Sequence, residues 1–126
     1  MKGTILTCFI FAALILGMIF AQMSLEKAGD EMTKPLDALT SAVDSDDWET
    51  ADSVLKDLSE KWAENDKWLA MLIDHGETDL IITTMSEISQ YEKYRDKPEL
   101  MANIETLREL LAHIPKKERV TLENIF

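Results

Sequence analysis

The amino-acid sequence predicts an all-α protein, with one N-terminal transmembrane helix followed by a small antiparallel up-down helical bundle. Three observations support this prediction. Residues 4–23 carry no formal charge and are mostly apolar, and as a helix they would span roughly 30 Å, the thickness of the hydrocarbon layer of a bilayer. Apolar residues recur at every third or fourth position through most of the remaining chain. Short polar links separate these periodic stretches, which favours antiparallel neighbours.

Residues 1–23 are interpreted as an uncleaved transmembrane anchor. The alternative is a cleaved secretory signal, which the positively charged Lys2 would suit. However, the apolar run is longer than the core of a usual signal peptide, and no A-x-A triplet closes it because Ile19 occupies the outer position. Cys8, the only cysteine, lies inside the run, so neither an intrachain disulfide nor a lipoprotein cysteine is predicted.

The orientation of the anchor follows weakly from its flanking charges. Lys2 precedes the run, while Lys27 and Lys34 follow it, so the positive-inside count is nearly tied. In the opposite orientation, the few residues before the span would have to cross the membrane. We therefore expect a single-pass protein of the cell membrane with an extracytoplasmic soluble part.

The soluble part, residues 24–126, is strongly acidic. It holds all 24 acidic residues and every basic residue except Lys2, so its net charge is about −12, against −11 for the whole chain. Such a surface repels phosphate, and no basic stripe with interleaved aromatic residues relieves the repulsion, so nucleic-acid binding is not expected. About a hundred residues can bury one modest core, which predicts one soluble domain.

Residues 24–45 are predicted to form a juxtamembrane helix. Pro35 interrupts this stretch, so a kink is expected, or a restart of the helix with Thr33 as its cap. The apolar stripe consists of Leu25, Ala28, Met32, Leu36, Leu39 and Val43.

Residues 46–126 are predicted to form the helical bundle. In its first helix, Asp46 and Glu49 have the spacing of a capping box, and Gly76 fits a left-handed residue that ends the helix at His75. The apolar stripe between them contains Trp48, Ala51, Leu55, Leu58, Trp62, Leu69 and Leu72.

Two further bundle helices are predicted from the same apolar periodicity and capping signals. One runs from about Thr78 to Tyr94. Asp96 and Glu99 repeat the capping spacing before the last helix, which Pro115 is expected to stop. The inward residues of the two helices are Ile81, Met85, Ile88 and Tyr91, then Leu100, Ile104, Leu107, Leu111 and Ile114. An apolar C-terminal tail, with Leu122, Ile125 and Phe126, is expected to fold back on the bundle.

The sequence contains no arrangement typical of an enzyme. Only Gly29 and Gly76 follow the anchor, so no glycine-rich loop can bind phosphate, and no nucleophile elbow or H-E-x-x-H is present. The acidic run 44–52 departs from a calcium loop, since Glu49 and Leu55 stand where glycine and glutamate are needed. We therefore predict no catalytic residues and no cofactor.

Two histidines form the candidate site. If the bundle helices alternate in direction, His75 and His113 lie at the ends of two helices at the same pole, together with the carboxylates Asp74, Glu77 and Asp79. This set could bind a divalent metal or sense pH. The alternative is that each histidine satisfies free carbonyls near a helix C-terminus. Basic residues expected at this pole, facing lipid headgroups or simply solvent, are Lys116, Lys117 and Arg119.

The tryptophans and the small residues of the anchor suggest contacts. Trp48 and Trp62 lie two heptads apart and are predicted to be core, whereas Trp68 falls off the apolar stripe and is predicted to be an exposed contact. In the anchor, small residues spaced by four would permit close pairing of two copies; they are Ala13, Gly17 and Ala21.

Several segments together resemble the domain of unknown function 4363 family. They are W-E-x-A at residues 48–51, W-L-A-M-L-I-D-H-G-E-T-D at 68–79, L-A-H-I-P-K-K-E at 111–118 and the closing T-L-E-N-I-F. The resemblance implies a short bacterial protein with an N-terminal hydrophobic segment and a helical remainder, without an established activity. Thr78 departs from the aliphatic residue expected there. Among the polar residues of the shared segments, the resemblance draws attention to Asp74, His75, Glu77, Asp79, His113 and Glu118.

The functional hypothesis is a membrane-anchored, non-enzymatic interaction or scaffold module of the bacterial envelope. Its membrane contact is residues 4–23, and its acidic bundle would bind another envelope protein or a second copy of itself. The alternative is a metal- or pH-responsive ligand-binding domain at the pole of His75 and His113.

Overall fold

The computed structural model describes residues 1–125, with side chains for residues 1–113. Four helices account for nearly all of this chain: α1 (Lys2–Asp44), α2 (Trp48–Leu72), α3 (His75–Lys93) and α4 (Lys97–Ile125). The predicted all-α class is therefore confirmed.

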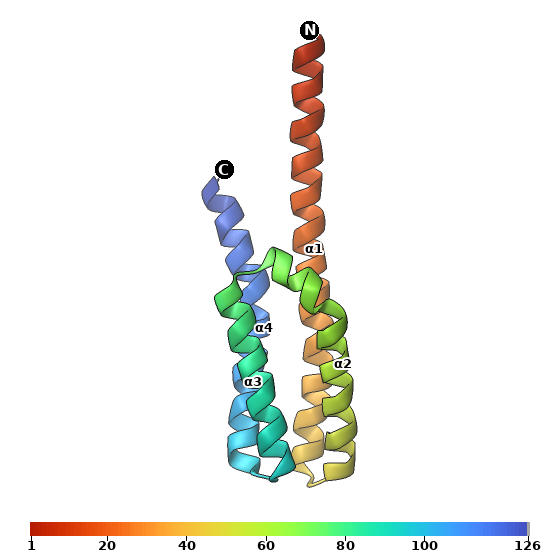
Figure 1. Ribbon diagram of the computed structural model, residues 1–126, viewed down its shortest axis with the longest axis vertical. Coiled ribbons are helices and arrows are strands. Elements are labelled where there is room, and N and C mark those ends of the chain that lie inside the picture. Colours follow the sequence, from red (N-terminus) through yellow and green to blue (C-terminus); the bar gives the residue numbers. More distant parts are fainter. Residues whose placement is uncertain (126) are drawn as a thin grey trace.

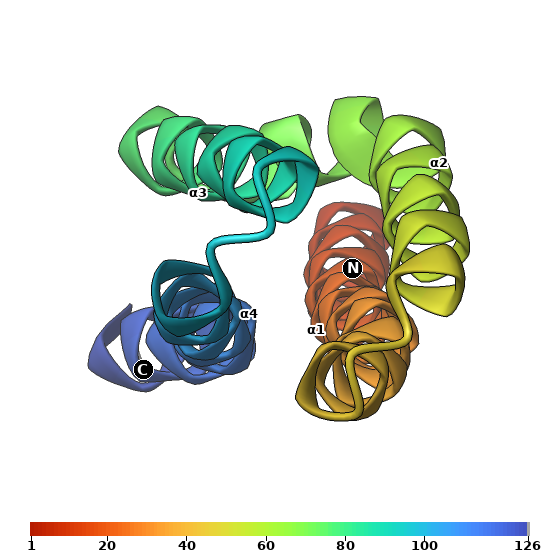
Figure 2. The same ribbon diagram turned by 90° about the horizontal axis from the view of Figure 1, so that it is seen from below.

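The helices form an up-down bundle in which each is antiparallel to its neighbour in the chain (Figure 1). Seen from below, they occupy the corners of a four-sided arrangement (Figure 2). Helix α1 packs against α2 and α4, and α4 packs against α3, whereas α2 and α3 have the smallest contact of the four neighbouring pairs. The first half of α1 continues beyond the bundle as a single helix.

The core contains the apolar stripes predicted from helical periodicity. On α1 the stripe from Leu25 to Val43 is buried, and it meets inward residues from the other three helices. The largest fully buried side chains outside α1 are Leu58, Ile81, Ile88, Leu100, Ile104, Leu107 and Leu111. The spacing of three and four residues places these side chains on one face of each helix, and that face is removed from water.

Helix α1 runs without interruption through Pro35, so the predicted restart at this residue is wrong. Thr33 is not a cap, because its hydroxyl donates to the Gly29 carbonyl within the same helix at 2.7 Å. Pro35 is itself buried on the apolar stripe, between the fully buried Met32 and Leu36. This packing holds the helix together across the hydrogen bond that proline cannot make.

The boundary between α2 and α3 also differs from the prediction. Helix α2 ends at Leu72, Ile73 is extended, and α3 begins at His75 with Asp74 as its N-cap. Gly76 therefore lies in the first turn of α3 and does not have the positive φ that was expected. A fully extended Ile73 reverses the chain without a left-handed residue.

Helix α4 continues through Pro115 to Ile125, so the predicted stop at this proline is wrong. Proline removes one hydrogen bond, but the residues after it are mostly good helix formers without glycine. The backbone of the tail rises beside the upper part of α1 as helix (Figure 1). Whether Leu122, Ile125 and Phe126 pack on the bundle lies outside the described residues.

The two turns at the bottom of Figure 1 share one backbone design. Asp46 and Arg95 both adopt a left-handed conformation with φ of 56°. The amides that follow reach back in the Schellman pattern: Asp47 N–H donates to the Ala42 carbonyl at 2.8 Å, and Asp96 N–H to the Tyr91 carbonyl at 2.9 Å. The predicted capping box of Asp46 and Glu49 is therefore wrong, because Asp46 closes α1 and the N-cap of α2 is Asp47. We refer to residues 44–47 and 93–97 as the lower pole, and to residues 68–79 around the α2–α3 turn as the upper pole.

Candidate functional site

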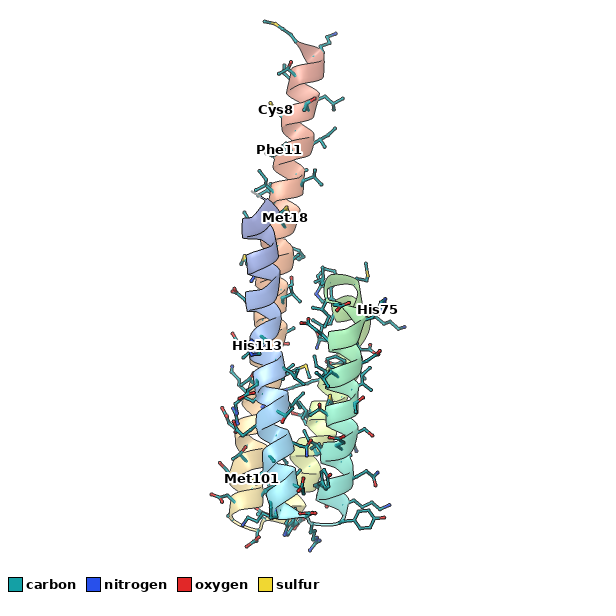
Figure 3. All side chains as sticks on the ribbon, turned by 90° about the vertical axis from the view of Figure 1, so that its left-hand side faces the viewer. Cys8, Phe11, Met18, His75, Met101 and His113 are labelled. Atoms are coloured by element: carbon teal, nitrogen blue, oxygen red, sulfur yellow. The ribbon has the colours of Figure 1, made fainter. Side chains whose placement is uncertain are left out.

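The upper pole contains most of the residues predicted to form a site. Asp74, His75 and Asp79 are exposed, and Glu77 is half-buried. His113 is also exposed, but it lies on α4, apart from His75 in the side view of Figure 3. Among the side chains that the structure describes, no group of three or more His, Cys, Asp or Glu residues could hold a metal ion.

The helix boundaries explain why the predicted ligands do not converge. His75 begins α3 and does not end α2, while His113 lies within α4, which passes through Pro115. Neither histidine is at a helix C-terminus, so the capping role considered as the alternative does not apply either. The structure places Asp74, His75 and Glu77 as neighbours at the start of α3, while His113 lies apart on α4.

The upper pole also carries an unusual apolar segment, residues 68–73 (Trp-Leu-Ala-Met-Leu-Ile). Leu69 and Ile73 are buried in the core, but Trp68 is 38% exposed and Met71 is 79% exposed. The segment is therefore apolar on its outer side as well as its inner side. Figure 1 shows this last part of α2 crossing the top of the bundle towards α3.

Trp68 connects this segment to the upper half of α1. Its ring meets the ring of Phe20 edge-on, with centroids 6.4 Å apart and an angle of 71° between the planes. This geometry is one that aromatic pairs favour. The prediction that Trp68 is exposed and Trp62 is core is confirmed, since Trp62 is buried. Trp48, also predicted to be core, is only half-buried and packs against the edge of the core.

Before this contact, α1 is exposed on all sides. The hydrophobic side chains of residues 5–20 extend into the surroundings, as the labelled Cys8 and Phe11 illustrate (Figure 3). In the described chain, this is the one helix long and apolar enough to cross a membrane. The first buried residue of α1 is Leu25, so the exposed segment and the bundle meet within one turn of Gln22.

The lower half of the bundle holds an acidic pair that the sequence analysis did not identify. Glu92 on α3 is 8% exposed, and its partner is Asp52 on α2. Burial raises the pKa of Glu92 to about 7, and the hydrogen bond and negative charge of Asp52 add to this rise, while Arg95 opposes it. The signal was present in the sequence, because Glu92 continues the stripe of Ile81, Met85 and Ile88.

An ion-pair network supports the contact between α1 and α4. The Arg108 guanidinium pairs with Asp37 across the helices and with Glu105 on its own helix, and it donates to the Thr40 hydroxyl at 3.5 Å. These acceptors raise the pKa of Arg108, so it stays charged at every physiological pH. The network connects the side chain of Arg108 on α4 to Asp37 and Thr40 on α1.

Two of the shallow grooves among the described side chains lie between helices. One, of about 380 Å³, separates the upper parts of α1 and α4 and is lined by Glu26, Gly29, Asp30, Thr33, Leu111 and Ala112. The other, of about 230 Å³, follows the loose contact of α2 and α3 and is lined by Ser59, Trp62, Ile82, Met85, Ser86 and Ser89. Neither set pairs a nucleophile with a histidine base in the way that covalent catalysis requires.

Comparison with known proteins identifies one match. The family model described as "Domain of unknown function (DUF4363)" matches residues 19–125. No curated protein and no solved structure matches the chain. The matched region contains the whole bundle and begins next to Phe20, within the last turns of the uncharged segment.

Proposed function

Because the chain belongs to the family of domain of unknown function DUF4363, whose description names no activity, we propose a function on structural grounds: this is a membrane-tethered, non-enzymatic interaction module of the bacterial envelope. Its N-terminal helix crosses the cell membrane once, and its acidic bundle stands outside the cytoplasm. There the bundle binds another envelope protein or a second copy of itself.

One observation carries the proposal. Residues 4–17 of α1 are uncharged and exposed on all sides, and they continue as the same helix into the buried stripe that begins at Leu25. A helix satisfies its own backbone hydrogen bonds, so it can enter lipid, and its apolar side chains are stabilised there and not in water. Without a flexible linker between span and bundle, the bundle is held close to the membrane surface.

The interaction role is supported by what the bundle offers to other molecules. Its surface is strongly acidic, its grooves are shallow, and the polar groups of the upper pole are spread along one turn. Such a surface suits a protein partner better than a small substrate, since ligand sites are usually deep and enclosed. Within the span, Gly17 and its small neighbours allow close pairing of two copies.

Extraction of cell membranes tests the anchor. We expect the full chain to stay in the membrane pellet at alkaline pH, and the double variant Ile10→Asp, Leu14→Asp to be released, because each charge at the centre of a span costs about 2.5–3.5 kcal/mol. Ile82→Asp is the matched control: Ile82 is similarly exposed but lies on the bundle, so this variant should remain in the pellet. Release of the wild-type chain would contradict the proposal.

Crosslinking in intact membranes tests the interaction role. We expect the wild-type chain to form a defined adduct with a protein partner or with itself. If it pairs through the span, Gly17→Leu should reduce the self-adduct, while Leu16→Ile should not. The metal-responsive alternative would instead require that zinc or manganese raise the melting temperature, and that the double variant His75→Ala, His113→Ala abolish this rise.

A further inference from the structure

We propose that the upper pole of the bundle is itself a membrane-contacting surface, with Trp68 and Met71 in the interfacial layer of the bilayer that α1 crosses. The inference rests on the proposed anchor and extends it. The bundle would touch the membrane at two places, the span and the last turns of α2, and its tilt would be restricted.

The first support is the position of Trp68 along α1. Its ring contacts Phe20, which lies six residues before Glu26, the first charged residue after the span. At the rise of an α-helix, Phe20 is about 9 Å from Glu26, on the side of the lipid. If residues 4–23 lie in the bilayer, the Trp68 ring must therefore lie at the level of its interface.

The second support is the composition of residues 68–73. A surface helix normally shows apolar residues to the core and polar residues to water. Here the inner positions Leu69 and Ile73 are apolar, and the outer positions Trp68 and Met71 are apolar as well. An outer apolar face at the end of the bundle nearest the span indicates that this face meets lipid.

The third support is the chemistry of the exposed groups. Tryptophan is enriched at membrane interfaces because its ring is apolar while its N–H can remain hydrated. The neighbouring Lys67 is exposed and can extend its ammonium towards headgroups. The nearby acidic residues Asp74 and Asp79 are also exposed, so the contact depends on apolar burial and should form on lipids without net charge.

A site-specific fluorophore in the full chain tests this inference. Met71→Cys in a Cys8→Ser background is labelled with an environment-sensitive dye and reconstituted in phosphatidylcholine vesicles that contain a shallow lipid-attached quencher. Tyr94→Cys is the matched control, since Tyr94 is 73% exposed at the lower pole. We expect the emission at residue 71 to shift to shorter wavelength and to be largely lost to the quencher, while residue 94 keeps its emission.

The vesicle experiment separates the two proposals. A chain that does not float with the vesicles overturns the anchor and this inference together. A chain that floats but shows equal, unquenched emission at residues 71 and 94 overturns this inference alone. Shifted but unquenched emission at residue 71, with a dimer on crosslinking, overturns it too, because a second copy would then cover the face.

A label-free measurement guards against effects of the dye. The double variant Trp48→Phe, Trp62→Phe leaves Trp68 as the single tryptophan, and its fluorescence should be quenched by brominated lipid. The corresponding variant that keeps only Trp48 should not be quenched. Equal quenching of both would overturn the inference, since Trp48 lies at the far end of α2.

Discussion

The two poles of the bundle are built from different chemistry. At the lower pole, two left-handed residues, Asp46 and Arg95, form Schellman turns, and Asp47 caps α2 by accepting from Thr50 N–H at 3.2 Å. Lys97 joins the two turns, because its ammonium donates to the Asp44 carbonyl at 3.0 Å and lies 3.4 Å from Asp46 Oδ1.

Among the residues that the structure describes, the upper pole has neither a left-handed turn residue nor a side-chain hydrogen bond from its N-cap residue. Its turn is made by an extended, buried Ile73, and in the described chain the N-cap Asp74 makes no side-chain hydrogen bond to α3. The outward residues of its last α2 turn are apolar. The lower pole is thus closed by charges and hydrogen bonds, whereas the upper pole, beside the exposed part of α1, is closed by apolar contacts.

The largest expected effect comes from buried leucines, one near each pole. Leu100→Ala, next to the lower pole, and Leu69→Ala, at the upper pole, should each lower the free energy of unfolding by about 2–5 kcal/mol, because both remove buried methyl groups and leave a cavity. Urea unfolding of the full chain in detergent measures this. Met71→Ala is the control and should have little effect; a loss equal to that of Leu69→Ala would mean that Met71 packs inside the protein.

The next effect is the pH dependence of the lower half. Since the pKa of Glu92 is raised to about 7 in the folded protein, the fold binds a proton more tightly than the unfolded chain does. The contribution of Glu92 to stability should therefore be greatest below the usual carboxyl range and be lost as pH rises through about 7, by at most about 3 kcal/mol.

Unfolding of Glu92→Gln at several pH values tests this dependence. The variant should be more stable than the wild type at pH 8, because the amide removes a buried charge beside Asp52, and its stability should change less between pH 4 and pH 8. The exposed Glu87→Gln is the matched control. An unchanged pH profile in Glu92→Gln would show that another group carries the dependence.

A smaller effect should distinguish the two N-caps. Asp47→Ala should destabilise the bundle, because the carboxylate accepts hydrogen bonds from both the amide and the hydroxyl of Thr50, whereas Asp74→Ala should be nearly neutral. These bonds lower the pKa of Asp47, so its contribution is present at neutral pH and is lost as pH falls through that lowered pKa. Thermal melts at neutral pH compare the variants, and equal losses would contradict the contrast between the poles.

The smallest effect concerns the left-handed residue of the α1–α2 turn. Asp46→Gly should raise the free energy of unfolding by about 0.5–1 kcal/mol, because glycine adopts positive φ without steric cost and the ion pair with Lys97 is exposed. Glu60→Gly, at an exposed position within α2, should lower it by a similar amount. If Asp46→Gly instead lowers the free energy of unfolding, the ion pair of Asp46 with Lys97 contributes more than the steric cost of its positive φ.

The helical class, the apolar face of each helix and the uncharged N-terminal segment can all be predicted from local sequence patterns. The stripes from Leu25 to Val43 and from Leu100 to Leu111 were predicted correctly, as was the cap at Asp96. These features depend on residues three or four positions apart, which the helix itself brings together. Glu92 lies at the next position of the same spacing, but the pattern of apolar residues does not predict that an acidic side chain is buried there.

Only the tertiary structure decided where the helices end and what meets across the chain. Local rules for Pro35 and Pro115 predicted breaks that the helices do not make, and the rule for Gly76 placed the end of α2 three residues too late. The contact of Phe20 with Trp68 and the separation of His75 from His113 depend on how distant segments align along the bundle. That alignment is set by the summed packing of all four helices, and no short pattern in the sequence encodes it.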